Sequence, residues 1–118
     1  MEYRVTFYER PDGVVPVQDY IAGLGSKDKA KVLKYIDFLR EHKGVLDEPY
    51  SKHIRGKVRE LRVDFSSNRH RIFYFTFVNK NIILLHAFLK RTPKTPAREI
   101  AIATHNCENV QDNRKLYE

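Results

Sequence analysis

Apolar and polar residues alternate along three consecutive stretches in the second half of the chain. The alternation predicts strands at about Val58–Phe65, Arg69–Val78 and Ile82–Leu89. Two short polar breaks, Ser-Ser-Asn and Asn-Lys-Asn, separate the stretches, and residues of these types favour tight turns. The three stretches therefore predict an antiparallel meander. The third stretch begins with apolar residues on both faces, which is typical of a central strand that is covered on both sides.

The remaining periodic patterns predict one more strand and three helices. Tyr3–Tyr8 alternates like a short strand. Pro16 opens a short stretch with apolar residues at helical spacing, and a longer helix is predicted at Lys27–His42. A last helix is predicted at about Ala97–Leu116. The expected fold class is α+β, a small antiparallel sheet of about four strands with two N-terminal helices and a C-terminal helix.

Length and composition limit the class of protein. A chain of 118 residues fits a single domain, which we expect to span residues 1–118. It has no apolar run of 18 residues and no signal-like N-terminus, so we expect a cytoplasmic protein without membrane contact. The single cysteine, Cys107, excludes an internal disulfide and a multi-cysteine zinc site.

Charge is distributed unevenly along the chain. The segment from Pro49 to Pro96 contains eleven Lys and Arg but only two acids, Glu60 and Asp64. The rest of the chain contains eleven basic and thirteen acidic residues, so the net charge of +7 comes entirely from this segment. A basic field on one rigid element is typical of a surface that binds a polyanion.

Three cations of this segment are predicted within strands or at a strand end: Arg62, Arg71 and Lys90. Solvated side chains are the ordinary interpretation of any one of them. Several on one sheet face would form a preorganised phosphate site, because Arg binds phosphate through two nitrogens and Lys acts as a point charge. Such a cluster can stabilise the phosphorane formed when RNA is cleaved and can lower the pKa of a neighbouring Lys. A ribonuclease without a metal is therefore chemically feasible.

Two other side chains are candidates for this chemistry. His53, in a loop predicted to lead into the first basic strand, is the best histidine candidate for acid–base work. Tyr74 could stack on a base, although strict alternation puts it on the face opposite Arg71. The alternating Phe73, Phe75 and Phe77 are more typical of a core.

Other chemistries lack their sequence signals. No glycine-rich phosphate loop, H-E-x-x-H or G-x-S-x-G motif occurs. Acidic residues are too few on the basic segment for the usual carboxylate-bound Mg²⁺ of nucleases, so neither a metal site nor a cofactor is expected.

Four motifs in order resemble the RelE/HigB toxin superfamily. They are Glu-Leu-Arg from Glu60, H-R-I-F-Y-F from His70, L-L-H-A-F-L-K-R from Leu84 and K-T-P-A-R-E-I-A-I-A from Lys94. The resemblance covers nearly the whole chain. More narrowly, the chain resembles the HigB-like, phage-derived branch of type II toxin–antitoxin systems. No single motif is highly specific, but their order and spacing together are fairly specific.

The resemblance implies a RelE-like fold and a metal-independent, ribosome-dependent mRNA interferase. Such toxins enter the ribosomal A site and cut the message, which inhibits translation. The implied partners are the ribosome, mRNA and a cognate antitoxin, commonly a HigA-like helix-turn-helix protein that binds operator DNA.

Site residues follow from the resemblance by position. The family's Y-R-x-x-Y strand falls on Arg71 and Tyr74, with His70 at the first tyrosine. Its other basic positions fall on Arg62, on the Lys90–Arg91 pair and on the Lys52–His53 pair. Arg62 and Arg71 are expected on the scissile phosphate, Lys90 and Arg91 as a clamp or proton donor, and His53 as a base. No tyrosine lies between Lys94 and His105 for the functional C-terminal tyrosine of RelE, so that role is either absent here or taken by His53 or Tyr74. The residues expected to bind RNA are Lys52, Arg55, Lys57, Arg59, Arg69, Arg91 and Lys94.

Two other functions are compatible with the same basic sheet. One is a non-catalytic module that binds nucleic acid and antitoxin, such as a decayed toxin or an operon co-repressor. The other is a phage-derived protein whose basic face mainly binds a protein partner.

Overall fold

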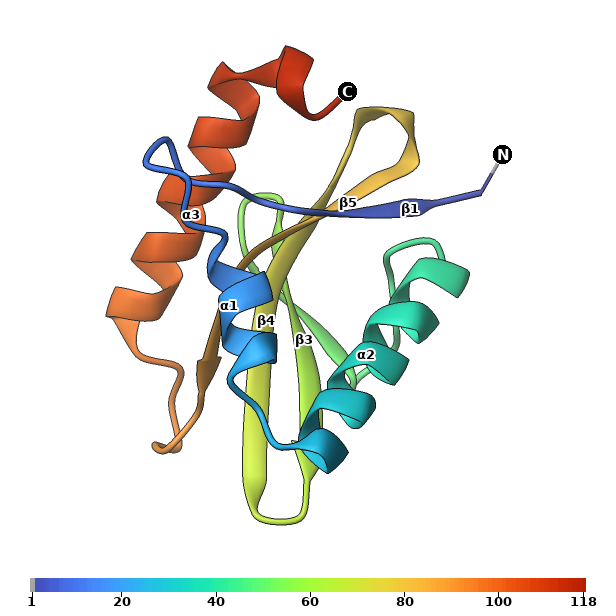
Figure 1. Ribbon diagram of the computed structural model, residues 1–118, viewed down its shortest axis with the longest axis vertical. Helices are drawn as coiled ribbons and strands as arrows, with labels where there is room; N and C mark the ends of the chain where they lie inside the picture. The colour runs from blue at the N-terminus through green and yellow to red at the C-terminus, as the bar shows by residue number, and fades with distance from the viewer. Residues whose placement is uncertain (1) are drawn as a thin grey trace.

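A computed structural model describes residues 2–118 as a twisted five-stranded sheet with helices on both faces (Figure 1). The α+β fold class is therefore confirmed. In chain order the elements are β1 (Arg4–Phe7), α1 (Pro16–Ala22), α2 (Ser26–Glu41), β2 (Ser51–Arg55), β3 (Val58–Phe65), β4 (Asn68–Phe77), the 3₁₀ turn η1 (Val78–Lys80), β5 (Asn81–Leu89), α3 (Ala97–Asp112) and the 3₁₀ turn η2 (Arg114–Leu116).

The strand order is β1-β5-β4-β3-β2. The meander of β3, β4 and β5 is antiparallel, as predicted, and its bounds agree with the prediction to within one residue. Two features differ from the expected antiparallel sheet of about four strands. There are five strands, and β1 pairs with β5 in parallel. Because it pairs with β1 on one side and β4 on the other, β5 is a central strand.

The additional strand is β2, which corrects the expectation that His53 lies in a loop. β2 pairs antiparallel with β3, and His53 lies opposite Arg59. Only Ile54 is apolar among its five residues, so the strand carries almost no hydrophobic periodicity. Backbone pairing with β3, rather than burial of its side chains, forms this edge strand.

The two faces of the sheet carry separate hydrophobic cores. Helices α1 and α2 cover one face, where Leu61, Ile72 and Leu84 are fully buried. Helix α3 covers part of the other, where Phe73 and Phe75 pack with Ala103 and other residues. We call these the α1/α2 face and the α3 face. The Phe ladder is therefore core, as its alternation indicated.

Helix α3 does not extend over the whole of its face. In Figure 1 the turn that joins β3 to β4 extends past the end of α3. Alternation along β3 and β4 therefore places several side chains of the α3 face outside the apolar core. No helix in residues 2–118 is both long enough and apolar enough to cross a membrane.

Candidate nucleic-acid interface

Four cations share the part of the α3 face that the helix leaves open: Lys52, Arg62, Arg71 and Lys90. Arg62 and Arg71 lie directly opposite each other on β3 and β4. Lys52 lies on β2 opposite Glu60, which precedes Arg62 by two residues on the same face. Lys90 follows β5, and its backbone N–H donates to the Arg69 carbonyl at 2.8 Å. The structure thus brings the three strand cations predicted from sequence together, and we call them, with Lys52, the cation cluster.

Arg71 is the most deeply held member of the cation cluster. Its Nη1 donates to Asp64 Oδ1 at 2.6 Å and to the His70 carbonyl at 3.0 Å. Only 5% of the residue is exposed, whereas the Asp64 side chain is 63% exposed. Its Nε is buried without a hydrogen-bond partner in the described chain. Arg71 therefore acts as a fixed positive charge at the floor of the cluster.

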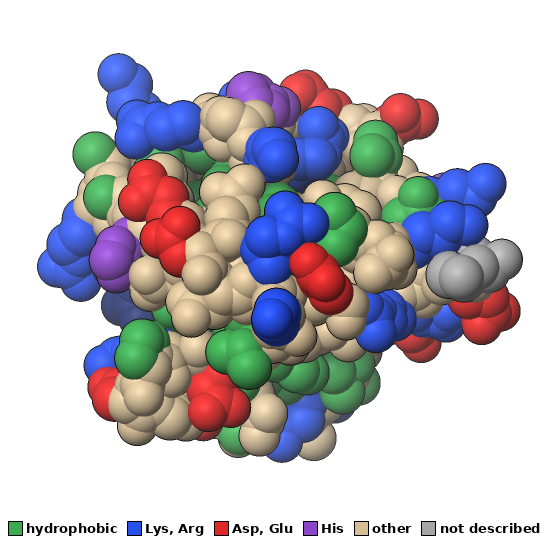
Figure 2. All heavy atoms as spheres, turned by 90° about the horizontal axis from the view of Figure 1, so that it is seen from above, with side chains coloured by type: hydrophobic (Ala, Val, Ile, Leu, Met, Phe, Trp, Pro, Cys, Tyr) green, Lys and Arg blue, Asp and Glu red, His purple; other side chains and the backbone are tan. Residues whose placement is uncertain are grey.

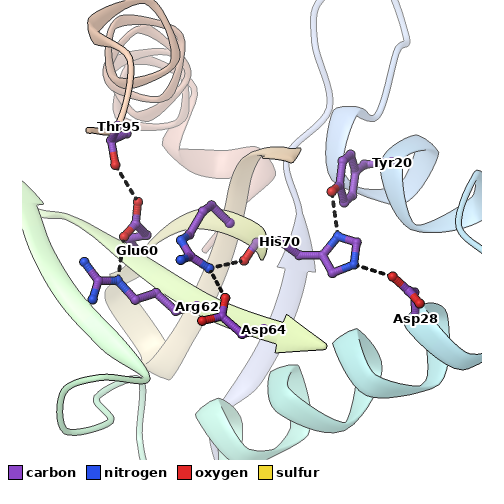
Figure 3. Close-up of polar contacts among 8 residues, drawn as sticks. Tyr20, Asp28, Glu60, Arg62, Asp64, His70 and Thr95 are labelled. Atoms are coloured by element: carbon purple, nitrogen blue, oxygen red, sulfur yellow. Dashed lines mark hydrogen bonds and ion pairs between the residues drawn. The ribbon is translucent and has the colours of Figure 1, made fainter. Parts of the chain in front are cut away.

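Arg62 is held by a different acid and is more accessible. Its Nε donates to Glu60 Oε1 at 3.0 Å, and its side chain is 24% exposed. Glu60 is completely buried, and its Oε2 accepts a hydrogen bond from Thr95 Oγ1 at 3.3 Å. Figure 3 shows the chain of contacts from Thr95 through Glu60 to Arg62. The segment between β5 and α3 is thereby attached to β3.

Lys90 has a perturbed pKa in this environment. Partial burial lowers the pKa of Lys90 below that of a free lysine, and the nearby positive charges of Arg71 and Arg62 lower it further. The negative charge of Glu60 opposes this effect. Lys90 is therefore suited to exchange a proton more readily than a solvated lysine.

The remaining predicted cations are spread over both faces. Arg59 lies on the α1/α2 face, where its Nε donates to Ser51 Oγ at 3.3 Å. Burial and the negative charge of Asp28 raise the pKa of Tyr20 to about 12, and the positive charge of Arg91 partly offsets this rise. Arg91 therefore lies near Tyr20. Arg69 shares the α3 face with Arg71 by alternation. Three more are exposed at the edge or in loops: Arg55, Lys57 and Lys94.

The two other candidates for acid–base chemistry, His53 and Tyr74, do not reach the cation cluster. His53 is exposed on β2, and its Nε2 lies 2.8 Å from the Gly56 carbonyl. Alternation puts it on the side of Ser51, opposite Lys52. Tyr74 is fully buried on the α1/α2 face, where its hydroxyl contacts Ser51 Oγ at 2.8 Å and the Gly44 carbonyl at 2.9 Å. In this structure its ring is therefore buried in the core and does not face the surface that carries the cation cluster.

His70, at the position of a family tyrosine, also faces away from the cation cluster. Its Nε2 lies 2.8 Å from Asp28 Oδ2, and its Nδ1 lies 2.7 Å from the Tyr20 hydroxyl. Figure 3 shows its ring between α1 and α2, on the other side of the sheet from Glu60 and Arg62. The hydrogen bond from His70 lowers the pKa of Asp28. This closed cluster joins both helices to β4.

Charge on the opposite end of the molecule is mixed. Figure 2, which looks onto the molecule from above the view of Figure 1, shows acidic side chains among the basic ones. Burial raises the pKa of the Cys107 thiol to about 11, as expected for an inert core cysteine. Within residues 2–118, no group of three or more His, Cys, Asp or Glu could hold a metal ion.

One residue of the site, Glu60, was not among the sequence-predicted candidates. The sequence places it on the same strand face as Arg62 and Asp64, which alone is typical of a solvated face. The available signal was the Glu-x-Arg spacing on one strand, because residues two apart share a face and contact each other. Its complete burial and its contact with Thr95, which lies before α3, are features that the strand pattern does not contain.

The fold and the cation cluster define an α+β protein of the RelE-like class. The chain matches the family model described as phage derived protein Gp49-like (DUF891) over residues 19–108, more than half of its length, and it belongs to this family. That family is a RelE/HigB-like toxin family, associated with toxin–antitoxin systems. No curated protein matches the chain significantly.

Proposed function

We propose that this protein is a HigB-like toxin that cuts translated mRNA in the ribosomal A site without using a metal. The observation that carries the proposal is the cation cluster, which rigid strands hold on an open face. An open face suits a polymer, because an RNA backbone must pass across it and cannot enter a closed cavity. The family membership supports a toxin with an antitoxin partner.

Cleavage of RNA by its own 2′-hydroxyl requires stabilisation of a doubly charged phosphorane. Arg62 presents its guanidinium to this charge, while Arg71 supplies a fixed positive charge beneath it. Lys52 and Arg69 would bind flanking phosphates, and exposed Lys94 and Arg91 would extend the contact toward the ribosome. Cytoplasmic ribosomes supply the remaining parts of the site, including the geometry of the message.

Proton transfer is assigned to Lys90. It lies beside both arginines, and its lowered pKa brings the neutral and charged forms closer in free energy at physiological pH. A protonated Lys90 can donate to the 5′-oxygen as the phosphodiester bond breaks. His53 lies on the other side of β2, so it would need a rearrangement of this edge strand to act as the base.

A binding module is the second candidate, and one observation favours it. Within residues 2–118, Glu60 is buried with both oxygens engaged, and Tyr74 and His53 lie on the other side of the sheet. Among these residues the cation cluster therefore has no free imidazole or phenol, and the exposed carboxylate beside it, Asp64, is paired with Arg71. On this alternative the protein binds ribosomes or nucleic acid, with steep salt dependence, and leaves RNA intact.

The experiment compares one message in translated and untranslated form. The protein is expressed briefly in cells that carry a reporter mRNA, and a matched reporter has its start codon replaced. Primer extension on the translated message should reveal discrete cuts at codon-spaced positions that are absent from the untranslated message. Equal cuts on both would indicate a free ribonuclease, and no cuts from a folded protein would favour the binding module.

The antitoxin belongs to the same proposal. We infer a cognate helix-turn-helix partner of the HigA kind, which covers the toxin and carries the complex to operator DNA. Co-expression of the neighbouring small reading frame should abolish growth arrest, and failure of every adjacent frame to do so would contradict this part of the proposal.

A further inference from the structure

The two acids of the basic segment have one feature in common, since each holds one of the two sheet arginines. Asp64 holds Arg71 through Nη1, and Glu60 holds Arg62 through Nε. The second contact leaves both terminal nitrogens of Arg62 free of partners among residues 2–118, and Figure 3 shows them pointing away from Glu60. Arg62 is thus fixed at its inner edge and open at its outer edge, the edge that binds phosphate through two nitrogens.

Glu60 itself is an unusual residue for this position. Its side chain is completely buried, although an ionised carboxylate is costly to remove from water unless it is paired and hydrogen-bonded. Both of its oxygens are engaged, one by Arg62 and the other by Thr95. Its complete burial keeps both oxygens away from the open surface, so it does not contact an RNA hydroxyl directly in this arrangement.

The contact with Thr95 adds a second consequence. Thr95 lies in the segment that joins β5 to α3, the same segment that carries Arg91 and Lys94. Glu60 therefore connects Arg62 on β3 with a loop that comes 35 residues later in the chain. A loop held in this way keeps the edge of the cation cluster in one arrangement before any substrate arrives.

We propose that Glu60 is a positioning residue, which orients the Arg62 guanidinium toward the scissile phosphate and fixes the β5–α3 segment at the edge of the cation cluster. This inference rests on the proposed ribonuclease function. It also predicts that neutralising Glu60 affects RNA binding and RNA cleavage differently. Neutralising Glu60 removes a negative charge from a site that binds a polyanion, so charge alone would strengthen RNA binding and would not slow cleavage. Loss of orientation would slow cleavage while binding is unchanged or tighter.

The test uses Glu60→Gln, Glu60→Ala and Thr95→Val, with Arg40→Ala on the exposed side of α2 as control. Single-turnover cleavage on programmed ribosomes and ribosome affinity are measured separately. Glu60→Gln keeps an acceptor for Arg62 Nε without the charge, so the rate should fall about tenfold with affinity equal or higher. The cleavage rate of Glu60→Ala should fall on the order of 10²-fold. Thr95→Val should lower the cleavage rate less than Glu60→Gln does.

A double-mutant cycle separates positioning from general damage. If Glu60 acts through Arg62, then Glu60→Ala should lower the cleavage rate much less in an Arg62→Lys background than in the native one. A purely structural role would give equal losses in both backgrounds. Equal losses, or a Glu60→Gln variant that cleaves at the native rate while Arg62→Ala is inactive, would overturn the inference.

A spectroscopic measurement keeps the inference testable if the native protein cleaves nothing, a result that would contradict the proposed function instead. The Nε–H resonance of Arg62 should exchange with water more slowly than that of exposed Arg98, and Glu60→Gln should shift it. Titration with inorganic phosphate should perturb Arg62 less in Glu60→Gln than in the native protein. An Arg62 Nε–H that exchanges as fast as that of Arg98 would contradict the positioning role directly.

Discussion

His70 and Arg71 are consecutive residues on β4, yet they belong to regions with opposite properties. His70 lies under α1 and α2, with both ring nitrogens engaged by Tyr20 and Asp28. Arg71 lies on the α3 face beyond the end of the helix, beside Arg62 and Lys90. The first cluster joins elements of the fold, while the second concentrates positive charge on an open surface. Helical cover, rather than residue type, therefore distinguishes a structural polar cluster from a candidate site on the same strands.

The largest difference between the two regions should appear in activity. Arg62→Ala should lower mRNA cleavage by about 10²- to 10³-fold, because it removes a donor aimed at the developing phosphorane charge. Its free energy of unfolding should also fall, because the substitution leaves the completely buried Glu60 without its cationic partner, so cleavage is compared per folded molecule. Primer extension measures the cleavage and urea unfolding measures the stability. Arg40→Ala, a matched removal from α2, should remain fully active, and full activity of Arg62→Ala would mean that the cation cluster is not the site.

Tyr74→Phe should show the reverse pattern. The substitution removes the hydroxyl that donates to the Gly44 carbonyl and contacts Ser51, so the free energy of unfolding should fall by about 1–3 kcal/mol. Cleavage per folded molecule should be unchanged, because the hydroxyl faces the other core. Parallel urea and cleavage measurements check this. A variant with native stability and lost cleavage would restore Tyr74 as a functional residue.

The third prediction concerns the pKa of Lys90 in the cation cluster. Partial burial and the charges of Arg71 and Arg62 lower its pKa, and Glu60 raises it. The pKa of Lys90 should therefore rise in Arg71→Ala and fall further in Glu60→Gln. Nuclear magnetic resonance of the lysine side chains across alkaline pH measures both changes, with exposed Lys27 as the reference. Opposite directions would show that these charges do not act on Lys90.

The smallest expected effect concerns acid stability of the closed cluster. The hydrogen bond from His70 and a second from Asn68 lower the pKa of Asp28 below the ordinary value of an aspartate. A carboxyl with a lowered folded-state pKa stabilises the protein above its unfolded pKa, and this stabilisation is lost as the pH falls through the folded value. Asp28→Asn should therefore reduce the dependence of stability on pH below about 4. Urea unfolding at several acidic pH values tests this, with Asp37→Asn on α2 as control.

The sequence was sufficient for the meander because β3, β4 and β5 carry strong two-residue periodicity. It also predicted the separation of Tyr74 from Arg71, since successive side chains of a strand point to opposite faces. It missed β2, whose only apolar residue is Ile54, and it could not show that β1 pairs in parallel with β5. Both features depend on backbone hydrogen bonds between distant segments, which leave no periodic signal.

The candidate site was predicted only in part for the same reason. Arg62, Arg71 and Lys90 could be selected as strand cations, and their strands bring them together. Burial of Glu60 required Thr95, which belongs to a loop whose position no local pattern specifies. The neighbours of His53 in the sequence indicated a loop. The structure instead puts it on the edge strand β2, with its side chain on the side of the sheet opposite the cation cluster.

The most direct measurement is cleavage by the purified protein of one mRNA in three states: free, bound to ribosomes with an empty A site, and bound to ribosomes whose A site holds tRNA. The account predicts a cut within the A-site codon in the second state alone, and none by Arg62→Ala in any state. Equal cleavage of free mRNA, or intact mRNA in all three states from folded native protein, would contradict it.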